Sequence, residues 1–218
     1  FSIVDSLYDS EKGNVVVIDE PELSLHPSLQ KRLKNLLLHF AKDRQIVIST
    51  HSPYFVDVPS FGAGAQLARV VATEAGTKIH QLSSESKAII HKLATNNIYN
   101  PHVFGLDARE LFFLDENVIL TEGQEDVLLF PRIFSQLGVS VPDVFFGWGA
   151  GGAGNIIQIC KILKDLGFSK VSAVFDGDKK KEAEECRGNY PEYFFVCIPA
   201  KDIRTKKARK STEDVEGL

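Results

Sequence analysis

Acidic residues at the ends of apolar runs are the first candidates for chemistry. Val15–Ile18 is an unbroken β-branched run that leads directly into Asp19 and Glu20. Such a run predicts a buried parallel strand, and open α/β sheets bind their ligands beside the carboxyl ends of these strands. Hydrolysis of a nucleoside triphosphate needs one carboxylate near Mg²⁺ and another group that orients the attacking water. Adjacent acids at a strand end can supply both.

A histidine lies at the end of the next apolar run. Ser28–Ala41 has apolar residues at helical spacing, and Gln45–Ser49 is a second buried strand that ends in Thr50-His51-Ser52-Pro53. Strand, helix and strand in this order predict a βαβ unit with parallel strands, which puts His51 at the edge that carries Glu20. Singly, an acidic pair is more often a polar strand end and a histidine more often a cap. Their combination favours a nucleotide site.

Two further acidic pairs occupy the second half of the chain. Glu122 follows a predicted strand and Asp126 comes one helical turn later, so the two can lie side by side. Asp176 and Asp178 follow another strand at a spacing where extended residues point the same way. A solvated turn explains either pair alone. Four converging carboxylates repel unless cations lie among them, and two cations can clamp the oxygens of a phosphodiester displacement.

An alternating α/β pattern must position these pairs. We expect strands at 117–121, 144–146, 170–175 and 193–198, and helices at 124–137 and 155–166. Weaker strands at 67–72 and 78–82 predict a hairpin or a sheet edge, followed by a polar helical connector. Pro131 lies inside the helix after Glu122 and should kink that helix or end it early, which affects the placement of Asp126.

A glycine-rich segment offers a different interpretation. Gly149, Gly151 and Gly154 fit the pattern GxGxxG between a strand and a helix, and Asp176 ends the next strand, as in a dinucleotide-binding site of the NAD type. That interpretation leaves Glu122 unexplained and gives Asp178 no role. We favour a tight strand–helix turn, with backbone contact to a DNA phosphate as a second possibility.

The composition is that of a soluble protein, with 218 residues, 44% hydrophobic, 25% charged and a net charge of −4. Overall charge therefore does not indicate nucleic-acid binding, although the basic stretches 179–181 and 201–210 suit contacts to a DNA backbone. The three cysteines lack metal-ligand spacing and suggest a reducing compartment. With no secretory signal and no apolar run long enough to cross a bilayer, we expect a cytoplasmic protein without a membrane partner.

The first motifs resemble the ABC ATPases of the SMC/RecF-like class. VVVIDEPELSLHP resembles Walker B with its D-loop, and STHSP resembles the H-loop. The resemblance implies that Asp19 assists Mg²⁺, Glu20 is the catalytic carboxylate and His51 contacts the γ-phosphate of ATP. It also places Ser24–His26 in the D-loop, which meets a partner ATPase domain. Neither a phosphate loop nor an LSxG signature is present, so we expect both upstream of Phe1.

The second motifs resemble the Toprim fold of topoisomerases, primases and several nucleases. Glu122 and Asp126 match its first acidic motif, and Asp176 with Asp178 matches its DxD. A Toprim domain behind an ABC ATPase resembles the OLD (overcoming lysogenization defect) nucleases, which include anti-phage effectors. That resemblance implies DNA nicking or cleavage with Mg²⁺ or Mn²⁺, assembly through the ATPase region, and a further acidic stretch that Glu216 would supply as a metal ligand.

We therefore predict an α/β protein in which a parallel-sheet ABC ATPase fragment precedes a Toprim (Rossmann-like) α/β domain. The expected parts are residues 1–82 of the ATPase, a helical connector at 83–115, and a Toprim domain at 116–218 that continues beyond Leu218. The predicted function is an ATPase-coupled, two-metal DNA endonuclease in anti-phage defence or DNA repair. Its partners are DNA, further copies of the chain and a defence-system protein. The alternatives are a non-catalytic SMC/RecF-like repair scaffold and, less favoured, the dinucleotide-binding domain.

Overall fold

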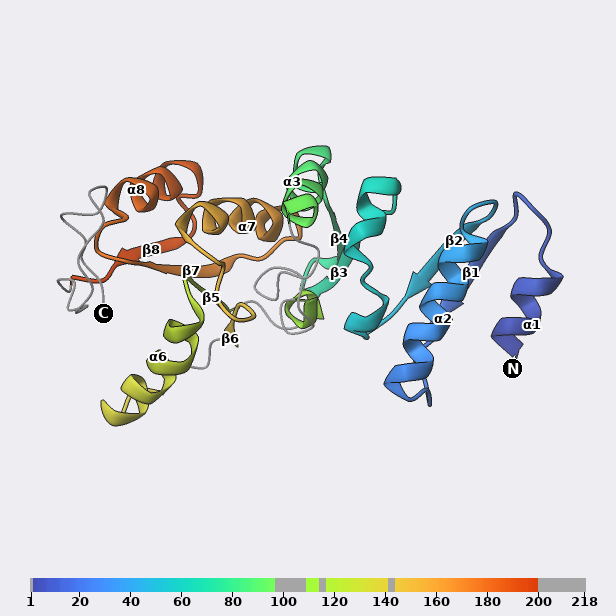
Figure 1. Ribbon diagram of the computed structural model, residues 1–218, viewed down its shortest axis with the longest axis horizontal. Coiled ribbons are helices and arrows are strands. Elements are labelled where there is room, and N and C mark those ends of the chain that lie inside the picture. Colours follow the sequence, from blue (N-terminus) through green and yellow to red (C-terminus); the bar gives the residue numbers. More distant parts are fainter. Residues whose placement is uncertain (1, 97–108, 114–116, 141–143, 200–218) are drawn as a thin grey trace. The chain divides into compact units, whose positions relative to one another are not determined.

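The computed structural model describes residues 2–96, 109–113, 117–140 and 144–199 (Figure 1). The chain divides into two compact units, Phe1–Asp57 and Val58–Leu218. The predicted domain limits at 82 and 115 differ from this division and stay predictions. Glu216 and the basic stretch 201–210 lie outside the described residues, as does much of the predicted connector.

The first unit is a small βαβ structure. Its elements are α1 (Ser2–Asp9), β1 (Val15–Asp19), α2 (Pro27–Phe40), β2 (Gln45–Ser49) and the short 3₁₀ helix η1 (Pro53–Phe55). β1 and β2 pair in parallel, with Asp19 opposite Ser49, so the two predicted nucleotide motifs begin at the same sheet edge.

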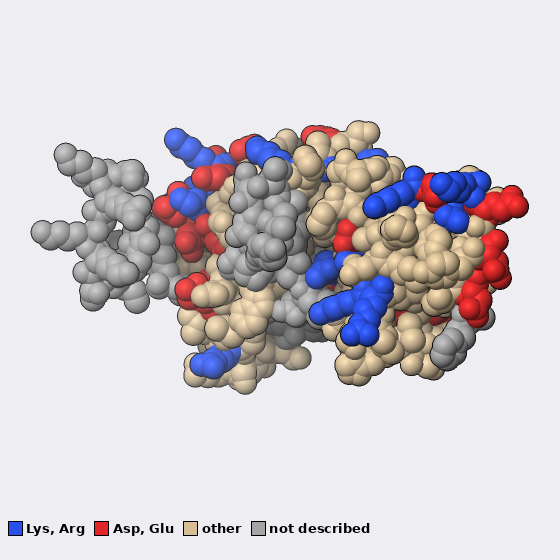
Figure 2. Space-filling view, turned by 45° about the vertical axis from the view of Figure 1, so that its right-hand side comes forward, with Lys and Arg blue, Asp and Glu red and all other residues tan. Residues whose placement is uncertain are grey.

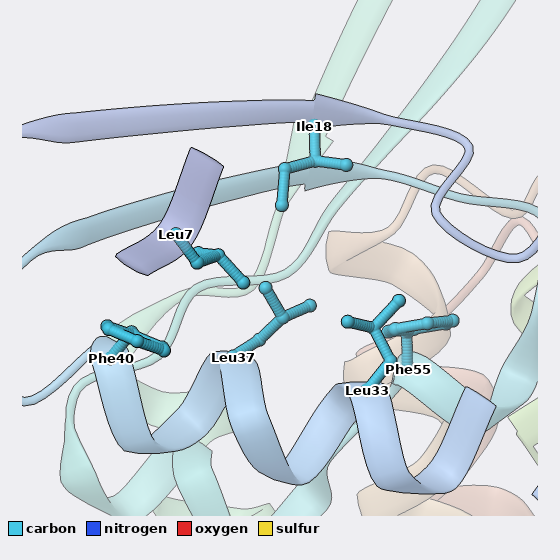
Figure 3. Close-up of a cluster of buried hydrophobic side chains, with 6 residues drawn as sticks. All are labelled: Leu7, Ile18, Leu33, Leu37, Phe40 and Phe55. Carbon is cyan, nitrogen blue, oxygen red and sulfur yellow. The ribbon is translucent and has the colours of Figure 1, made fainter. Parts of the chain in front are cut away.

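The core of the first unit lies between the sheet and α2. Figure 3 shows Leu33, Leu37 and Phe40 projecting from α2 toward Ile18 and Leu7. These α2 residues are spaced four and three apart, so they share one face of the helix. The expected stripe is confirmed except at its start, where Leu29 is exposed.

The second unit begins with smaller elements. These are the 3₁₀ helix η2 (Val58–Ala63), the antiparallel hairpin β3 (Ala68–Thr73) and β4 (Gly76–Gln81), α3 (Ser84–Asn96) and the 3₁₀ helix η3 (Leu111–Phe113). The predicted hairpin is confirmed. Asp165 accepts a hydrogen bond from the backbone N–H of Ser83, at 2.9 Å, and so holds the start of α3 against the following domain.

A four-stranded parallel sheet forms the rest of the second unit. Its elements are β5 (Asn117–Thr121), α6 (Gln124–Gln136), β6 (Val144–Phe145), α7 (Ala153–Asp165), β7 (Lys170–Phe175), α8 (Lys180–Asn189) and β8 (Phe194–Cys197). The strand order is β6-β5-β7-β8. Right-handed crossovers in this order put α6 on one face and α7 with α8 on the other, as Figure 1 shows.

The strand order also creates a switch point between β5 and β7. The chain leaves β5 toward β6 and leaves β7 in the opposite direction, toward β8. Ligands of open α/β sheets bind at the carboxyl ends of strands where the connections diverge in this way. The residues that follow Thr121 and Phe175 therefore stand at the expected binding edge of the sheet.

Two helices differ from the sequence-based expectations. α6 runs through Pro131 to Gln136, so the proline does not end the helix early. Stacking of Phe130 on Phe134 and on Phe145 of β6, at centroid distances of 5.9 and 6.4 Å, supports the helix around the proline. α8 was not expected, because its sequence is mostly charged; Ala183 and Cys186 give it a narrow buried side.

Charge is mixed on the surface. On the face in Figure 2, acidic and basic side chains alternate among larger uncharged areas. Over the described part of that face there is no continuous basic surface, in agreement with the net charge of −4. Within the described ranges, no helix is both long enough and apolar enough to cross a membrane.

Candidate active sites

The two acidic motifs of the second unit meet at the switch point. β5 and β7 pair in parallel with Thr121 opposite Val174, so Glu122 and Asp176 leave adjacent strands at nearly the same level. Glu122 Oε1 accepts a hydrogen bond of 3.0 Å from the backbone N–H of Asp176. The first acidic motif is thus joined directly to the DxD motif, although 54 residues separate them in the sequence.

Several carboxylates and a lysine influence one another at this end of the sheet. Burial raises the pKa of Glu122 to about 7; the negative charges of Asp176 and Asp178 act in the same direction, against the Asp176 amide and Lys179. Lys179 is paired with Asp178 at 2.8 Å, and this hydrogen bond raises the pKa of the lysine. Lys179 thus lies between the carboxylates of Asp178 and Glu122.

Asp126 has a different role in this conformation. Its Oδ2 accepts a hydrogen bond of 3.1 Å from the backbone N–H of Gly123, which caps the start of α6. Burial raises the pKa of Asp126, and the neighbouring Glu125 contributes to the shift while the Gly123 amide opposes it. Among the described residues, no group of three or more acidic, histidine or cysteine side chains converges closely enough to hold a metal ion.

The glycine-rich segment is hydrogen-bonded to the backbone that carries Glu122. The backbone N–H of Ala150 donates to the carbonyl of Thr121 at 2.7 Å, and those of Gly151 and Gly152 both donate to the carbonyl of Glu122 at 2.9 Å. Gly149 lies so close that a Cβ there would be 2.5 Å from the carbonyl oxygen of Gly123. These three amides are therefore engaged with the carbonyls of Thr121 and Glu122, which disfavours a dinucleotide or DNA phosphate and supports the interpretation as a structural turn.

The predicted nucleotide residues gather at the edge of the first unit. Asp19 accepts a hydrogen bond from the Ser49 hydroxyl, and the backbone N–H of Glu20 donates to the carbonyl of Ser49 at 2.9 Å. His51 Nε2 lies 3.9 Å from Glu20 Oε1, so the carboxylate and the imidazole face the same space. Glu20 has φ of +45°, a left-handed conformation that costs a non-glycine residue about 1–2 kcal/mol. Strain of this kind concentrates at functional sites.

Sequence reasoning missed one acidic residue here. Glu22 binds the segment after β2 through both carboxylate oxygens, one to Thr50 Oγ1 and one to the backbone N–H of His51, each at 2.6 Å. An acid two positions after the Asp19-Glu20 pair was the available signal. In the predicted D-loop, Ser24 has φ of +60° and His26 caps α2 through Ser28.

Comparison with known proteins agrees with this arrangement. A family described as an AAA domain, putative AbiEii toxin, type IV toxin–antitoxin system, matches residues 1–57, which are the first compact unit. The Toprim domain of overcoming lysogenization defect protein-like sequences matches residues 112–178, which include both acidic motifs. An OLD nuclease of Thermus scotoductus is 34% identical over 170 residues, covering 72% of this chain and 30% of that protein.

The chain belongs to the OLD family. The Old nuclease of Escherichia phage P2 is a second relative, 24% identical over 164 residues, which are 73% of this chain and 27% of that protein. The chain thus spans less than a third of the length of these curated relatives. The two family matches confirm the predicted order of the parts, an ATPase segment followed by a Toprim domain.

Proposed function

We propose that the protein is an ATPase-coupled, divalent-metal-dependent DNA endonuclease. The observation that carries the proposal is the hydrogen bond from the Asp176 amide to Glu122, which joins both acidic motifs at the switch point of the sheet. Two curated OLD relatives are named as nucleases, which supports the same activity.

Mg²⁺ or Mn²⁺ suits this edge by the chemistry of its donors. Glu122, Asp176 and Asp178 offer only oxygen ligands, which these ions prefer. When bound, two such ions would stabilise the attacking and leaving oxygens of a phosphodiester displacement. Asp126 would join the ligands through Oδ1 while its Oδ2 keeps the bond to Gly123, and Glu216 is a further proposed ligand.

The acidic residues would act together with Lys179. In our proposal, Glu122 serves as a metal ligand and doubles as general base or acid, because its hydrogen bond to the Asp176 amide holds it beside the DxD motif. Lys179 holds Asp178 in place through a bond of 2.8 Å. Lys180 and Lys181 begin α8 beside this edge and would contact the DNA backbone without reading sequence.

The first unit would use ATP with Mg²⁺. We propose that Asp19 assists the metal, that Glu20 orients or activates the attacking water, and that His51 contacts the γ-phosphate. The proximity of Glu20 and His51 supports these roles, as do the hydrogen bonds from Ser49 to Asp19 and from Glu20 to Ser49. Nucleotide use would regulate or assemble the nuclease.

The wider setting is also part of the proposal. We propose a cytoplasmic protein that assembles with further copies of itself through the ATPase region and acts in anti-phage defence or DNA repair. A defence-system protein is a further proposed partner. A repair scaffold that binds DNA without cutting it remains the alternative that the cleavage test decides.

Plasmid nicking by the intact protein with Mg²⁺ or Mn²⁺ tests the proposal. Asp176→Ala and Asp178→Ala should abolish nicking without unfolding the protein, since both residues lie after β7 and outside the core. Chelation by EDTA should abolish it as well, and added Mn²⁺ should restore it. Cleavage that persists in both variants, or no cleavage with any metal by a folded protein, would refute the endonuclease proposal.

A further inference from the structure

Glu22 forms a clamp on the segment that carries His51. Its Oε2 accepts a hydrogen bond from Thr50 Oγ1 and its Oε1 accepts one from the backbone N–H of His51, both at 2.6 Å. Thr50 Oγ1 in turn accepts a bond of 3.0 Å from the backbone N–H of Ser52. One carboxylate therefore fixes the path of the chain where it leaves β2.

Glu22 is itself held firmly. Pro21, which precedes it, is fully buried and has a fixed φ, so the backbone that leads into Glu22 has little freedom. One residue earlier, the N–H of Glu20 is bonded to the carbonyl of Ser49. The ends of β1 and β2 are thus joined three times: by the Ser49 hydroxyl bonded to Asp19, through the backbone at Glu20, and through the side chain of Glu22.

The His51 ring projects from the segment that this clamp holds. The side chain of His51 is 85% exposed, so packing does little to hold it. Its Nε2 nevertheless lies 3.9 Å from Glu20 Oε1. The bond from the His51 N–H to Glu22 therefore holds the backbone from which the imidazole projects toward Glu20.

We propose that Glu22 is a positioning residue for ATP hydrolysis, which acts through the backbone of His51. This inference rests on the proposed ATPase function of the first unit. Glu22 need not touch the nucleotide: it holds the histidine where both His51 and Glu20 can face the γ-phosphate. Loss of the clamp should slow the chemical step more than it weakens nucleotide binding.

Glu22→Gln is the sharpest substitution because it keeps the size of the side chain. The amide has one acceptor oxygen where the carboxylate has two, and its NH₂ group would face either the Thr50 hydroxyl or the His51 N–H. With the oxygen toward His51, the bond to Thr50 must reverse its direction, and with the NH₂ toward His51 that bond is lost. In both orientations the carboxylate charge is gone, so the clamp is weakened. Glu11→Gln is the matched control, since Glu11 is an exposed residue of the turn before β1 in the same unit.

Two measurements on the intact protein test the proposal. Steady-state ATPase kinetics should show kcat reduced about 10- to 100-fold in Glu22→Gln, with KM within about twofold of wild type, because a catalytic group displaced by about 1 Å loses this much rate. Hydrogen–deuterium exchange should be faster in peptides that cover Thr50–Ser52. Glu11→Gln should change neither quantity.

The outcomes separate the clamp from the proposed function. Wild-type kcat in Glu22→Gln, or a loss of kcat that matches a loss of folded protein by circular dichroism, overturns the positioning role. Unchanged exchange at Thr50–Ser52 overturns the clamp itself. Absence of ATP hydrolysis in the wild-type protein overturns the proposed ATPase and the role of Glu22 in it, even where exchange shows that the clamp exists.

Discussion

Replacement of Gly149 by alanine should disturb the acidic edge, whereas the same change at Gly138 should not. Both glycines have left-handed backbone, with φ of +81° and +68°. They differ in what a Cβ would meet. At Gly138 there is nothing within 4 Å, but at Gly149 the Cβ would be 2.5 Å from the carbonyl oxygen and 2.7 Å from the carbonyl carbon of Gly123.

Gly149→Ala and Gly138→Ala should lose different amounts of folding stability. Left-handed backbone costs alanine about 1–2 kcal/mol, and the stiffer unfolded chain returns about 0.4–1 kcal/mol at either position. At Gly149, the loop and Gly123 must also separate by about 0.9 Å to reach ordinary contact at 3.4 Å. Overpacking of this kind costs about 1–3 kcal/mol. Gly149→Ala should therefore lose about 1–3 kcal/mol more stability than Gly138→Ala.

Urea unfolding of the 218-residue chain measures this difference. Trp148, its single tryptophan, precedes Gly149 and reports the loop by fluorescence. In the intact protein, Gly149→Ala should also reduce metal-dependent nicking, because the loop supports the backbone of Glu122. Equal stability losses in the two variants, within about 0.5 kcal/mol, would refute the idea that the loop presses on the acidic motif.

Two further predictions concern the second unit. Burial of Asp165 raises the pKa of its carboxyl. Hydrogen bonds from Ser83, Ser86 and Lys161 lower the pKa by more, so that it lies below 3.8. This stabilisation is complete above about pH 4 and is lost as the pH falls through the folded pKa. By urea unfolding, Asp165→Asn should thus lose about 1–3 kcal/mol of stability at pH 7 and less at pH 3. An equally large loss at pH 3, or in the control variant Glu85→Gln, would contradict this prediction. Leu163→Ala, in the buried face of α7, should lose about 2–5 kcal/mol of stability, and Leu128→Ala, at an exposed position, less than about 1 kcal/mol. Equal losses would contradict the placement of Leu163 in the core.

The sequence predicts the strands well because their physical signals are local. Val15–Ile18 and Lys170–Phe175 are rich in β-branched and aromatic residues and end in acids, so both their strand character and their functional ends are evident. The parallel-sheet rule then brings Glu122 and Asp176 to one edge without knowledge of the fold. The α/β fold follows from the same alternation of strands and helices.

Side-chain partners could not be predicted, because they depend on how distant segments meet. Nothing local indicates that Glu22 binds the amide of His51, or that Asp126 caps its own helix instead of facing the DxD motif. The amides of the glycine-rich segment suit a phosphate equally well until β5 is placed beside them. Likewise, α6 continues through Pro131, and Phe130 beside it stacks on Phe145, a contact made across the fold.

Metal-dependent nicking by Glu122→Gln is the most direct test of the central claim, that both acidic motifs form one nuclease site. The intact protein would be assayed on supercoiled plasmid with Mn²⁺ beside Glu125→Gln, an exposed acid three positions further on. We predict at least about a 100-fold loss of nicking for Glu122→Gln, as for removal of a group that acts in the transition state, and no loss for Glu125→Gln. Equal nicking by both variants and the wild-type protein would contradict the account.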